Sequence, residues 1–259
     1  MKIERKEIIT KDGKKVLQVT TQDERWYLVD KIYYPSVTWI LAFYHKSPRL
    51  VKWIADKGWD EAEQTKNEAA EKGSRIHHAC SDILRGKEIP HDAKYPNSTG
   101  EVSELSVEEY EAVMSFAVWL KEAQPEIIAN EYTVINKKDG YAGTVDLKCK
   151  IKGETWIIDL KTGQGTYPSY ALQVSAYRHA DPVDKIGILQ VGYQRNQSRY
   201  KFTEVQDKYP IFLATKQIWD NEVSEKNPPQ KDYPLSVKWE KPKKVVKKVV
   251  RRKHGKNTT

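Results

Sequence analysis

Residues 141–161 combine two β-patterned segments with three side chains that are able to do chemistry. The segments read YAGTVDLKCK and IKGETWIIDLK, and Gly153 permits the positive φ of a tight turn between them. With Lys152 and Gly153 as the two turn residues, the register predicts that Asp146 lies opposite Asp159. Directly opposed residues hold their Cβ atoms roughly 5 Å apart, so we expect a close pair of carboxylates.

A lysine shares the face of the second carboxylate. Asp159 and Lys161 are two residues apart and point to one side of their strand, while Ile158 and Leu160 point into the core. Two carboxylates at this distance repel each other unless a cation lies between them. Two acids and a lysine that converge in this way are typical of a metal-dependent site for phosphodiester chemistry.

The rest of the chain must position these residues, and its patterns predict an α/β fold. Helix, three meandering strands, helix and a further strand indicate a mixed sheet with helices on its faces. An N-terminal β-hairpin and a helical insertion precede this core. The expected elements are a hairpin around Asp12-Gly13, a strand at 25–29, short helices capped by Ser36 and Ser47, a helix at 60–84, a loop at 87–104, a helix capped by Ser106, strands at 126–137 and 141–161, a helix at 170–179, strands at 185–194 and 199–205, and a helix at 211–223.

The helix after Ser106 has a clear start and stop. Ser106-Val107-Glu108-Glu109 matches a capping box, and Pro125 ends the helix. Apolar residues at helical spacing are expected to face the core. They are Val107, Tyr110, Val113, Met114, Ala117 and Val118.

Length and composition indicate one large domain. The 259 residues are 39% hydrophobic and 31% charged, which is typical of a soluble globular protein. No run approaches the roughly 18 apolar residues of a membrane span, and the N-terminus lacks a signal-peptide core. We therefore expect no membrane partner and a cytoplasmic setting, in a bacterium or a phage-infected host cell. The predicted division is an N-terminal element at 1–32, a catalytic domain at 33–240 and a tail at 241–259.

Cys80 and Cys149 are the chain's two cysteines. Two thiols are too few for an iron–sulfur cluster or a four-thiolate zinc site. They also indicate a reducing compartment without a disulfide framework. We therefore expect no iron–sulfur cluster.

The tail at 241–259 holds nine Lys or Arg and no Asp or Glu, whereas the whole chain has a net charge of +8. The body therefore carries a net charge of about −1. Such a tail can gather polyanions through counterion release, or it can be a solvated, disordered end. Its valines recur at helical spacing, so it can also fold on DNA, on a single-strand-binding or recombination protein, or on an acidic surface.

Two further regions leave alternatives open. Basic residues interleaved with aromatics suit a platform for single-stranded nucleic acid, or a helix pair with core aromatics, which we favour; they are Lys46, Arg49 and Lys52 among Trp39, Tyr44 and Trp53. His77, taken alone, is more often a surface or core histidine than a ligand. Glu131 lies one strand over from the acid pair, where it either faces the site or points to solvent.

Several short motifs occur in order along the chain. They are Gly73-x-x-Ile76-His77, Glu131, Gly143-Thr144-x-Asp146, Asp159-Leu160-Lys161 and Gln173-x-x-x-Tyr177. Together they resemble the PD-(D/E)xK nuclease superfamily, and more narrowly its RecB-like branch, which includes CRISPR-adaptation nucleases and the mitochondrial genome-maintenance exonuclease. Pro35-Ser36-Val37-Thr38 is similar to that exonuclease subgroup. The resemblance covers about residues 33–205, and Val145 replaces the proline that names the superfamily.

This resemblance implies a restriction-endonuclease-like core and a set of roles. His77, Asp146 and Asp159 would bind Mg²⁺ or Mn²⁺, as two ions in the family's manner, with help from the Leu160 carbonyl. Lys161 would orient or activate the attacking water, and Glu131 would support the metal or the water. Gln173 and Tyr177 would position the DNA strand and the active-site hairpin. The candidate DNA contacts are Lys46, Arg49, Lys52 and Arg75.

The expected function is that of a metal-dependent DNA exonuclease. We expect it to act on single-stranded ends or flaps in recombination, repair or replication, with DNA as its partner. The alternatives are a structure-specific or restriction-like endonuclease and a duplex exonuclease of recombination type. From other classes, a DNA-binding module that lost cleavage and a partner-binding adaptor tethered by the tail stay open.

Overall fold

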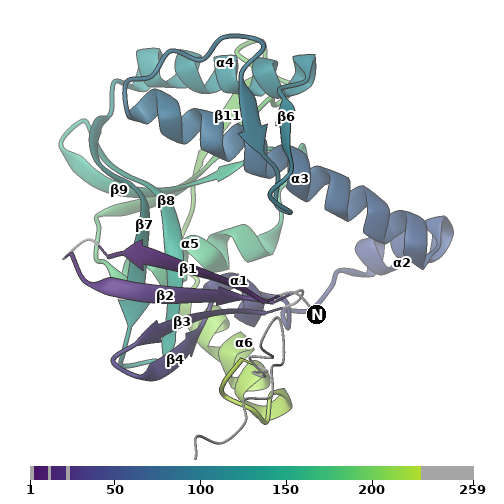
Figure 1. Ribbon diagram of the computed structural model, residues 1–259, viewed down its shortest axis with the longest axis vertical. Helices are drawn as coiled ribbons and strands as arrows, with labels where there is room; N and C mark the ends of the chain where they lie inside the picture. Colours follow the sequence, from purple (N-terminus) through teal and green to yellow (C-terminus); the bar gives the residue numbers. More distant parts are fainter. Residues whose placement is uncertain (1–2, 11–12, 22–23, 229–259) are drawn as a thin grey trace, which may run out of the picture. The chain divides into compact units, whose positions relative to one another are not determined.

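A five-stranded sheet carries Asp146 and Asp159 on two neighbouring strands, and its ribbon is shown in Figure 1. The structure is a computed structural model that describes residues 3–10, 13–21 and 24–228. The strands are β7 (Glu126–Asn136), β8 (Tyr141–Ile151), β9 (Glu154–Lys161), β10 (Lys185–Val191) and β11 (Tyr200–Glu204), in the order β11-β10-β9-β8-β7. Strands β9 and β10 pair in parallel, and the other neighbours are antiparallel. The predicted mixed sheet is confirmed.

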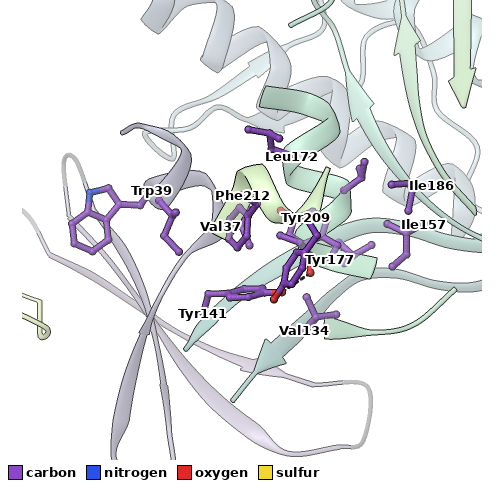
Figure 2. Close-up of a cluster of buried hydrophobic side chains, with 14 of the residues drawn as sticks. Val37, Trp39, Val134, Tyr141, Ile157, Leu172, Tyr177, Ile186, Tyr209 and Phe212 are labelled. Atoms are coloured by element: carbon purple, nitrogen blue, oxygen red, sulfur yellow. Dashed lines mark hydrogen bonds between the residues drawn. The ribbon is translucent and has the colours of Figure 1, made fainter. Parts of the chain in front are cut away.

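Helix α5 (Pro168–Ala180) makes the crossover that the parallel pair requires. It lies on one face of the sheet with α1 (Val37–Leu41) and α6 (Tyr209–Glu222), and buried side chains of all three helices share a core with alternate strand residues (Figure 2). Helices α3 (Trp59–Leu84) and α4 (Val107–Ala123) form the second core on the other face. Ile157 faces the first core and Ile158 the second, as strand alternation requires.

The N-terminal residues form a second sheet. Its strands are β1 (Glu4–Ile9), β2 (Lys15–Thr20), β3 (Arg25–Val29) and β4 (Ile32–Pro35), all paired antiparallel in sequence order. Trp26 lies in the α5-side core, and the Tyr27 hydroxyl lies 3.0 Å from Thr144 Oγ1 on β8. The boundary predicted between residues 32 and 33 falls inside β4.

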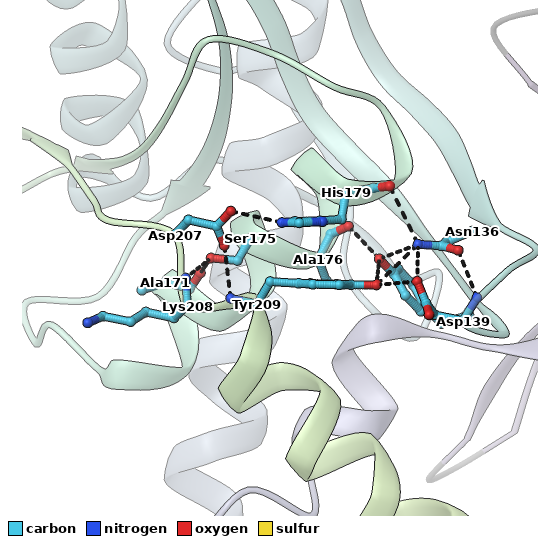
Figure 3. Close-up of polar contacts among 10 residues, drawn as sticks. Asn136, Asp139, Ala171, Ser175, Ala176, His179, Asp207, Lys208 and Tyr209 are labelled. Carbon is cyan, nitrogen blue, oxygen red and sulfur yellow. Dashed lines mark hydrogen bonds and ion pairs between the residues drawn. The ribbon is translucent and has the colours of Figure 1, made fainter.

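A polar network fastens α5 and α6 to the turn between β7 and β8 (Figure 3). The Tyr209 hydroxyl donates to Asp139 at 2.6 Å, and the Tyr141 hydroxyl donates to the Ala176 carbonyl at 2.9 Å. The His179 ring stacks on Tyr209 with centroids 3.6 Å apart. Because α5 also carries Gln173 and Tyr177, this network helps to fix their position beside the acidic residues.

Helix α2 (Pro48–Lys57) buries none of its residues. It lies beside the N-terminal end of the 26-residue helix α3, away from the five-stranded sheet (Figure 1). The predicted caps Ser47 and Ser36 are confirmed, since each side chain accepts a main-chain N–H in the first turn of its helix. None of the helices within the described ranges is long and apolar enough to cross a membrane.

Helix α4 begins at the predicted capping box, but its buried face differs from the prediction. Val113 is buried as predicted, but Val107 is 78% exposed, and Met114 and Val118 are also exposed. The large aromatic residues Phe116 and Trp119 occupy the core instead and stack with centroids 5.8 Å apart. The helix is apolar on several sides, so burying its two largest rings decides its rotation.

The loop predicted at 87–104 contains a short hairpin of β5 (Lys94–Pro96) and β6 (Val102–Glu104). The buried Asn97 side chain closes its turn by accepting the main-chain N–H groups of Thr99 and Glu101 at 2.9 Å each. Strands of three residues are too short for a periodic signal, which is why the sequence pattern did not predict them. The basic tail at 241–259 lies outside the described residues.

Candidate functional site

Glu131, Asp146 and Asp159 line a cavity of about 680 Å³. Side chains from both sheets and from α1, α3 and α5 surround it. A larger cavity of about 910 Å³ lies between α4 and residues 195–199. We place the candidate site in the smaller cavity because the predicted catalytic residues converge there.

Three side chains form a potential metal site, called here the His–acid cluster: His77, Glu131 and Asp146. One ligand atom of each lies within 4.8 Å of the others. His77 Nδ1, from α3, is 3.6 Å from Asp146 Oδ1, on β8. Histidine, taken alone, gave a weak signal, but the fold brings His77 to the predicted acid.

The predicted register is confirmed along the β8–β9 hairpin, from Ile151 opposite Glu154 to Leu147 opposite Ile158. The pairing ends one step before Asp146 and Asp159. There the Asp146 side chain accepts the main-chain N–H of Leu160 at 2.8 Å. This hydrogen bond to the main chain of β9 fixes the orientation of the Asp146 carboxylate.

Strand β7 is irregular where it faces Asp146. The register with β8 is the same immediately before and after Glu131, with Asn130 opposite Leu147 and Tyr132 opposite Val145, but Glu131 itself has a left-handed φ of 49°. Beside this irregularity Val145 faces the α5-side core and Leu147 faces the opposite core, although regular alternation would put both on one face. A non-glycine residue in this conformation marks local strain that the surrounding structure must maintain.

Asp159 and Lys161 form the second part of the site. Lys161 Nζ lies 2.7 Å from Asp159 Oδ2 and donates to Gln173 Oε1 at 3.1 Å. Gln173 Nε2 donates both to Asp159 Oδ1 at 2.8 Å and to the Tyr177 hydroxyl at 3.0 Å. Gln173 and Tyr177 line the cavity but are buried. Their contacts hold Asp159 and Lys161 in place.

The charges in the cavity shift one another's ionisation. Burial would lower the pKa of His77, but the Asp146 carboxylate raises it to about 9. Burial and the charge of Asp146 raise the pKa of Glu131 to about 7. The residue as a whole is exposed, but its carboxyl group lies inside the His–acid cluster. Burial also raises the pKa of Asp159 to about 6, against the pull of Lys161. Burial opposes ionisation of Asp146 as well, but His77 keeps the pKa of that carboxyl below its usual value.

The residues present fit a divalent cation. Two carboxylates and an imidazole supply the oxygen and nitrogen ligands that Mg²⁺ and Mn²⁺ accept. Asp159 is also buried, and its Oδ2 lies 2.7 Å from the Lys161 ammonium. It would add a third carboxylate beside the cluster.

Other predicted site residues lie elsewhere. Lys46, Arg49 and Lys52 are exposed on α2 or just before it, and they do not line the cavity. Arg75 lies on α3 but forms a largely buried ion pair with Glu109, with Nη2 2.7 Å from the carboxylate. That contact joins α3 to α4, so the structure gives Arg75 a structural partner.

The two interpretations of the aromatic residues each describe part of the structure. Trp39 is a core residue, with ring centroids 4.7 Å from Trp26 and 4.9 Å from Trp219. Trp53 is exposed on α2, and Trp59 at the start of α3 is 65% exposed. The core interpretation therefore holds for Trp39 and in part for Tyr44, which is half-buried against the same core, whereas Trp53 is exposed.

Three basic residues at the cavity were not predicted: Lys6 on β1, Arg25 on β3 and Arg85 at the end of α3. The resemblance begins near residue 33 and so excludes the first two. In the sequence, Lys6 and Arg25 are polar residues of strands, which pattern alone assigns to solvent. Only the packing of the N-terminal sheet brings them to the site.

One motif glycine is explained by a close contact. A Cβ atom on Gly143 would lie 2.5 Å from Tyr177 Cε1, so no side chain fits there unless Tyr177 moves. A Cβ atom on Gly73 would lie 3.4 Å from Thr162 Oγ1, which is an ordinary van der Waals distance, so this contact does not require a glycine.

No family model matches the sequence, and no curated protein matches it. Among solved structures, the crystal structure of SSO0001 aligns with 70% of this chain and 72% of its own, at 14% identity and a TM-score of 0.33. The alkaline exonuclease LHK-Exo from Laribacter hongkongensis aligns with 70% of this chain and 81% of its own, at 8% identity and a TM-score of 0.38. Likeness of this extent leaves the residues of the cavity as the basis for a function.

Proposed function

We propose that this chain is a metal-dependent DNA nuclease. The observation that carries the proposal is that the His–acid cluster and the Asp159–Lys161 pair line one cavity. The acids, the histidine and the lysine come from α3, β7, β8 and β9, so the fold alone unites them. The resemblance in sequence motifs supports the same chemistry.

The His–acid cluster and Asp159 would bind Mg²⁺ or Mn²⁺, as one ion or two. A bound divalent cation lowers the pKa of a water and stabilises the negative charge that develops on the phosphate. An ammonium has three N–H donors. Gln173 takes one of those of Lys161, and Asp159 faces another. At least one donor remains for a phosphate oxygen or for the attacking water.

The basic residues at the cavity would bind the DNA backbone. Lys6 and Arg25 are exposed, and neither forms an ion pair with any residue in the described ranges. Arg85 is also exposed, 3.3 Å from Asp82. Each phosphate contact of this kind adds affinity that falls as salt rises.

We further propose that the enzyme acts as an exonuclease on single-stranded ends or flaps. Helix α2 and the N-terminal end of α3 lie away from the sheet and expose Trp53 and Trp59 beside the basic residues of α2. Exposed rings among basic side chains suit unpaired bases and their phosphates. Roles in recombination, repair or replication, a cytoplasmic setting, and capture of DNA or a partner protein by the tail stay predictions.

Cleavage of end-labelled single-stranded, duplex and closed circular DNA with Mg²⁺ or Mn²⁺ tests the proposal. Asp159→Asn and Lys161→Met should each abolish cleavage. Lys185→Met is the matched control, because Lys185 lies on the neighbouring strand and pairs with the surface residue Glu154. Its activity should equal that of the wild type.

The substrates separate the alternatives. Loss of linear DNA with intact circles supports the exonuclease, and nicked circles indicate an endonuclease. Binding without cleavage by the wild type refutes the nuclease proposal and favours a binding module. Deletion of residues 241–259 should leave cleavage of short substrates intact, whereas a tethered adaptor would lose its function.

A further inference from the structure

The segment that follows Lys161 is fixed by two glutamines. Gln190 on β10 is almost fully buried, and its Nε2 donates to the carbonyls of Gly163 at 2.8 Å and Gly165 at 3.1 Å. Gln164 Nε2 donates at 2.8 Å to the carbonyl that follows β10. The segment 162–167 is therefore held at the Gly163 and Gly165 carbonyls and at the side-chain amide of Gln164. Such preorganisation reduces the entropy lost when a ligand binds.

This anchored segment presents Tyr167 at the protein surface. A Cβ atom on Gly165 would lie 2.9 Å from the Tyr167 hydroxyl oxygen and 3.0 Å from two of its ring carbons, so the ring rests against the glycine. The Tyr170 ring meets it edge-on, with centroids 5.4 Å apart and planes at 78°. The ring is held from two sides, and yet Tyr167 remains 51% exposed.

Tyr170 of this pair is in contact with Lys161. Lys161 Nζ lies 4.8 Å from the centroid of the Tyr170 ring. Two contacts of about 5 Å therefore separate Tyr167 from Lys161, one from Lys161 to Tyr170 and one from Tyr170 to Tyr167. A base that reaches Tyr167 therefore belongs to one of the first few nucleotides beside the scissile phosphate.

We propose that Tyr167 is a stacking platform for an unpaired nucleobase, which rests on the proposed nuclease function. Beside the ring lies a cavity of about 260 Å³ with a mainly apolar wall, lined among others by Pro168, Tyr170, Ile188 and Val205. Aromatic rings accept the face of any base, so such a site binds without sequence preference. Bases inside a duplex are already stacked on one another. The platform therefore selects single-stranded DNA close to the cleavage point.

The test compares Tyr167→Ala and Tyr167→Phe on single-stranded oligonucleotides, with and without an abasic site at each of the first nucleotides from the cleaved end. Stacking on one base is worth about 1–3 kcal/mol, and 1.4 kcal/mol corresponds to a factor of about ten. Tyr167→Ala should raise KM about tenfold with little change in kcat, and Tyr167→Phe should retain the wild-type KM. Ile218→Ala is the control, because Ile218 on α6 is also 51% exposed.

The abasic substrates identify the interaction itself. For the wild type, one abasic position should raise KM about as much as Tyr167→Ala does, and Tyr167→Ala should lose nothing more at that position. Two results overturn the platform. One is an equal KM for the wild type and Tyr167→Ala on intact single strands. The other is a KM for Tyr167→Ala that stays about tenfold above that of the wild type on every abasic substrate. If the wild type does not cleave, the nuclease proposal fails separately. The dissociation constants of the same oligonucleotides, measured by fluorescence anisotropy without metal, then decide the platform by the same comparison.

Discussion

Replacing Glu131 is expected to stabilise the metal-free protein while it reduces nuclease activity. Two features of the folded state oppose this residue: its left-handed φ of 49° and the neighbouring carboxylate of Asp146. Glu131→Gly removes both the strain and the charge. Glu131→Gln keeps the backbone strain and removes the charge alone. The pair of variants therefore separates the two contributions.

The backbone contribution can be estimated from the conformation. A left-handed conformation costs a non-glycine residue roughly 1–2 kcal/mol, and glycine loses about 0.5–1 kcal/mol through its freedom in the unfolded chain. The net gain for Glu131→Gly from the backbone is therefore about 0–1.5 kcal/mol, independent of pH. Any further gain, shared with Glu131→Gln, must come from the charge.

The charge contribution depends on pH with a definite sign. Burial and Asp146 raise the folded-state pKa of Glu131 to about 7, above the value near 4.3 that is usual for glutamate. Between these two values the folded state binds more protons than the unfolded state, so wild-type stability falls as pH rises. The advantage of Glu131→Gln should be small at pH 5 and complete above pH 7.

Urea denaturation in EDTA at pH 5 and pH 8 measures both contributions, with Glu126→Gln as the control on an exposed residue of the same strand. Adding Mg²⁺ or Mn²⁺ should stabilise the wild type more than either Glu131 variant, because a ligand that binds the folded state stabilises it by mass action. A Glu131→Gln protein that is less stable than the wild type in EDTA at pH 8 would refute the reasoning.

Three other predictions follow from the same contacts. Gly143→Ala places a methyl group 2.5 Å from Tyr177 Cε1, so urea denaturation should show a loss of about 1–3 kcal/mol together with lower activity; an unchanged midpoint would contradict the contact. Arg75→Met should destabilise the protein by about 3 kcal/mol at pH 7. Burial would raise the pKa of Glu109, but hydrogen bonds from Ser106 and Arg75 lower it, so the stabilisation by this ion pair is present above the usual carboxyl pKa and is lost as pH falls through the lowered value. An arginine that contacts DNA would instead change KM and leave stability unchanged. Calorimetry should show Mn²⁺ affinity of the His–acid cluster rising between pH 6 and pH 9, because the metal displaces protons held by groups of raised pKa; a flat profile would exclude the cluster as the ligand set.

Local rules were sufficient for the hairpin that carries the acids. A two-residue turn at Lys152-Gly153 fixes the register of both strands, so Asp146 and Asp159 are placed by counting from the turn. Helix starts at Ser36 and Ser47 follow equally from capping chemistry. In each case the determining contacts lie within a few residues of one another in the sequence.

Tertiary packing decided what the sequence could not. The burial of Phe116 rather than Val107 depends on which side of α4 meets the sheet. The left-handed Glu131 has no sequence signal, because a glutamate in a strand pattern is expected to be extended. Lys6 and Arg25 reach the cavity through the packing of one sheet on another.

The distribution of charge is the physical reason to expect a cation in this cavity. Burial opposes ionisation of Asp159, and burial together with Asp146 opposes that of Glu131. Under the proposed function, a divalent cation would favour the ionised form of these acids and would leave Lys161, still held by Gln173, as positive charge for a phosphate. A metal site would also account for the left-handed Glu131, since local strain of this kind persists where function requires it.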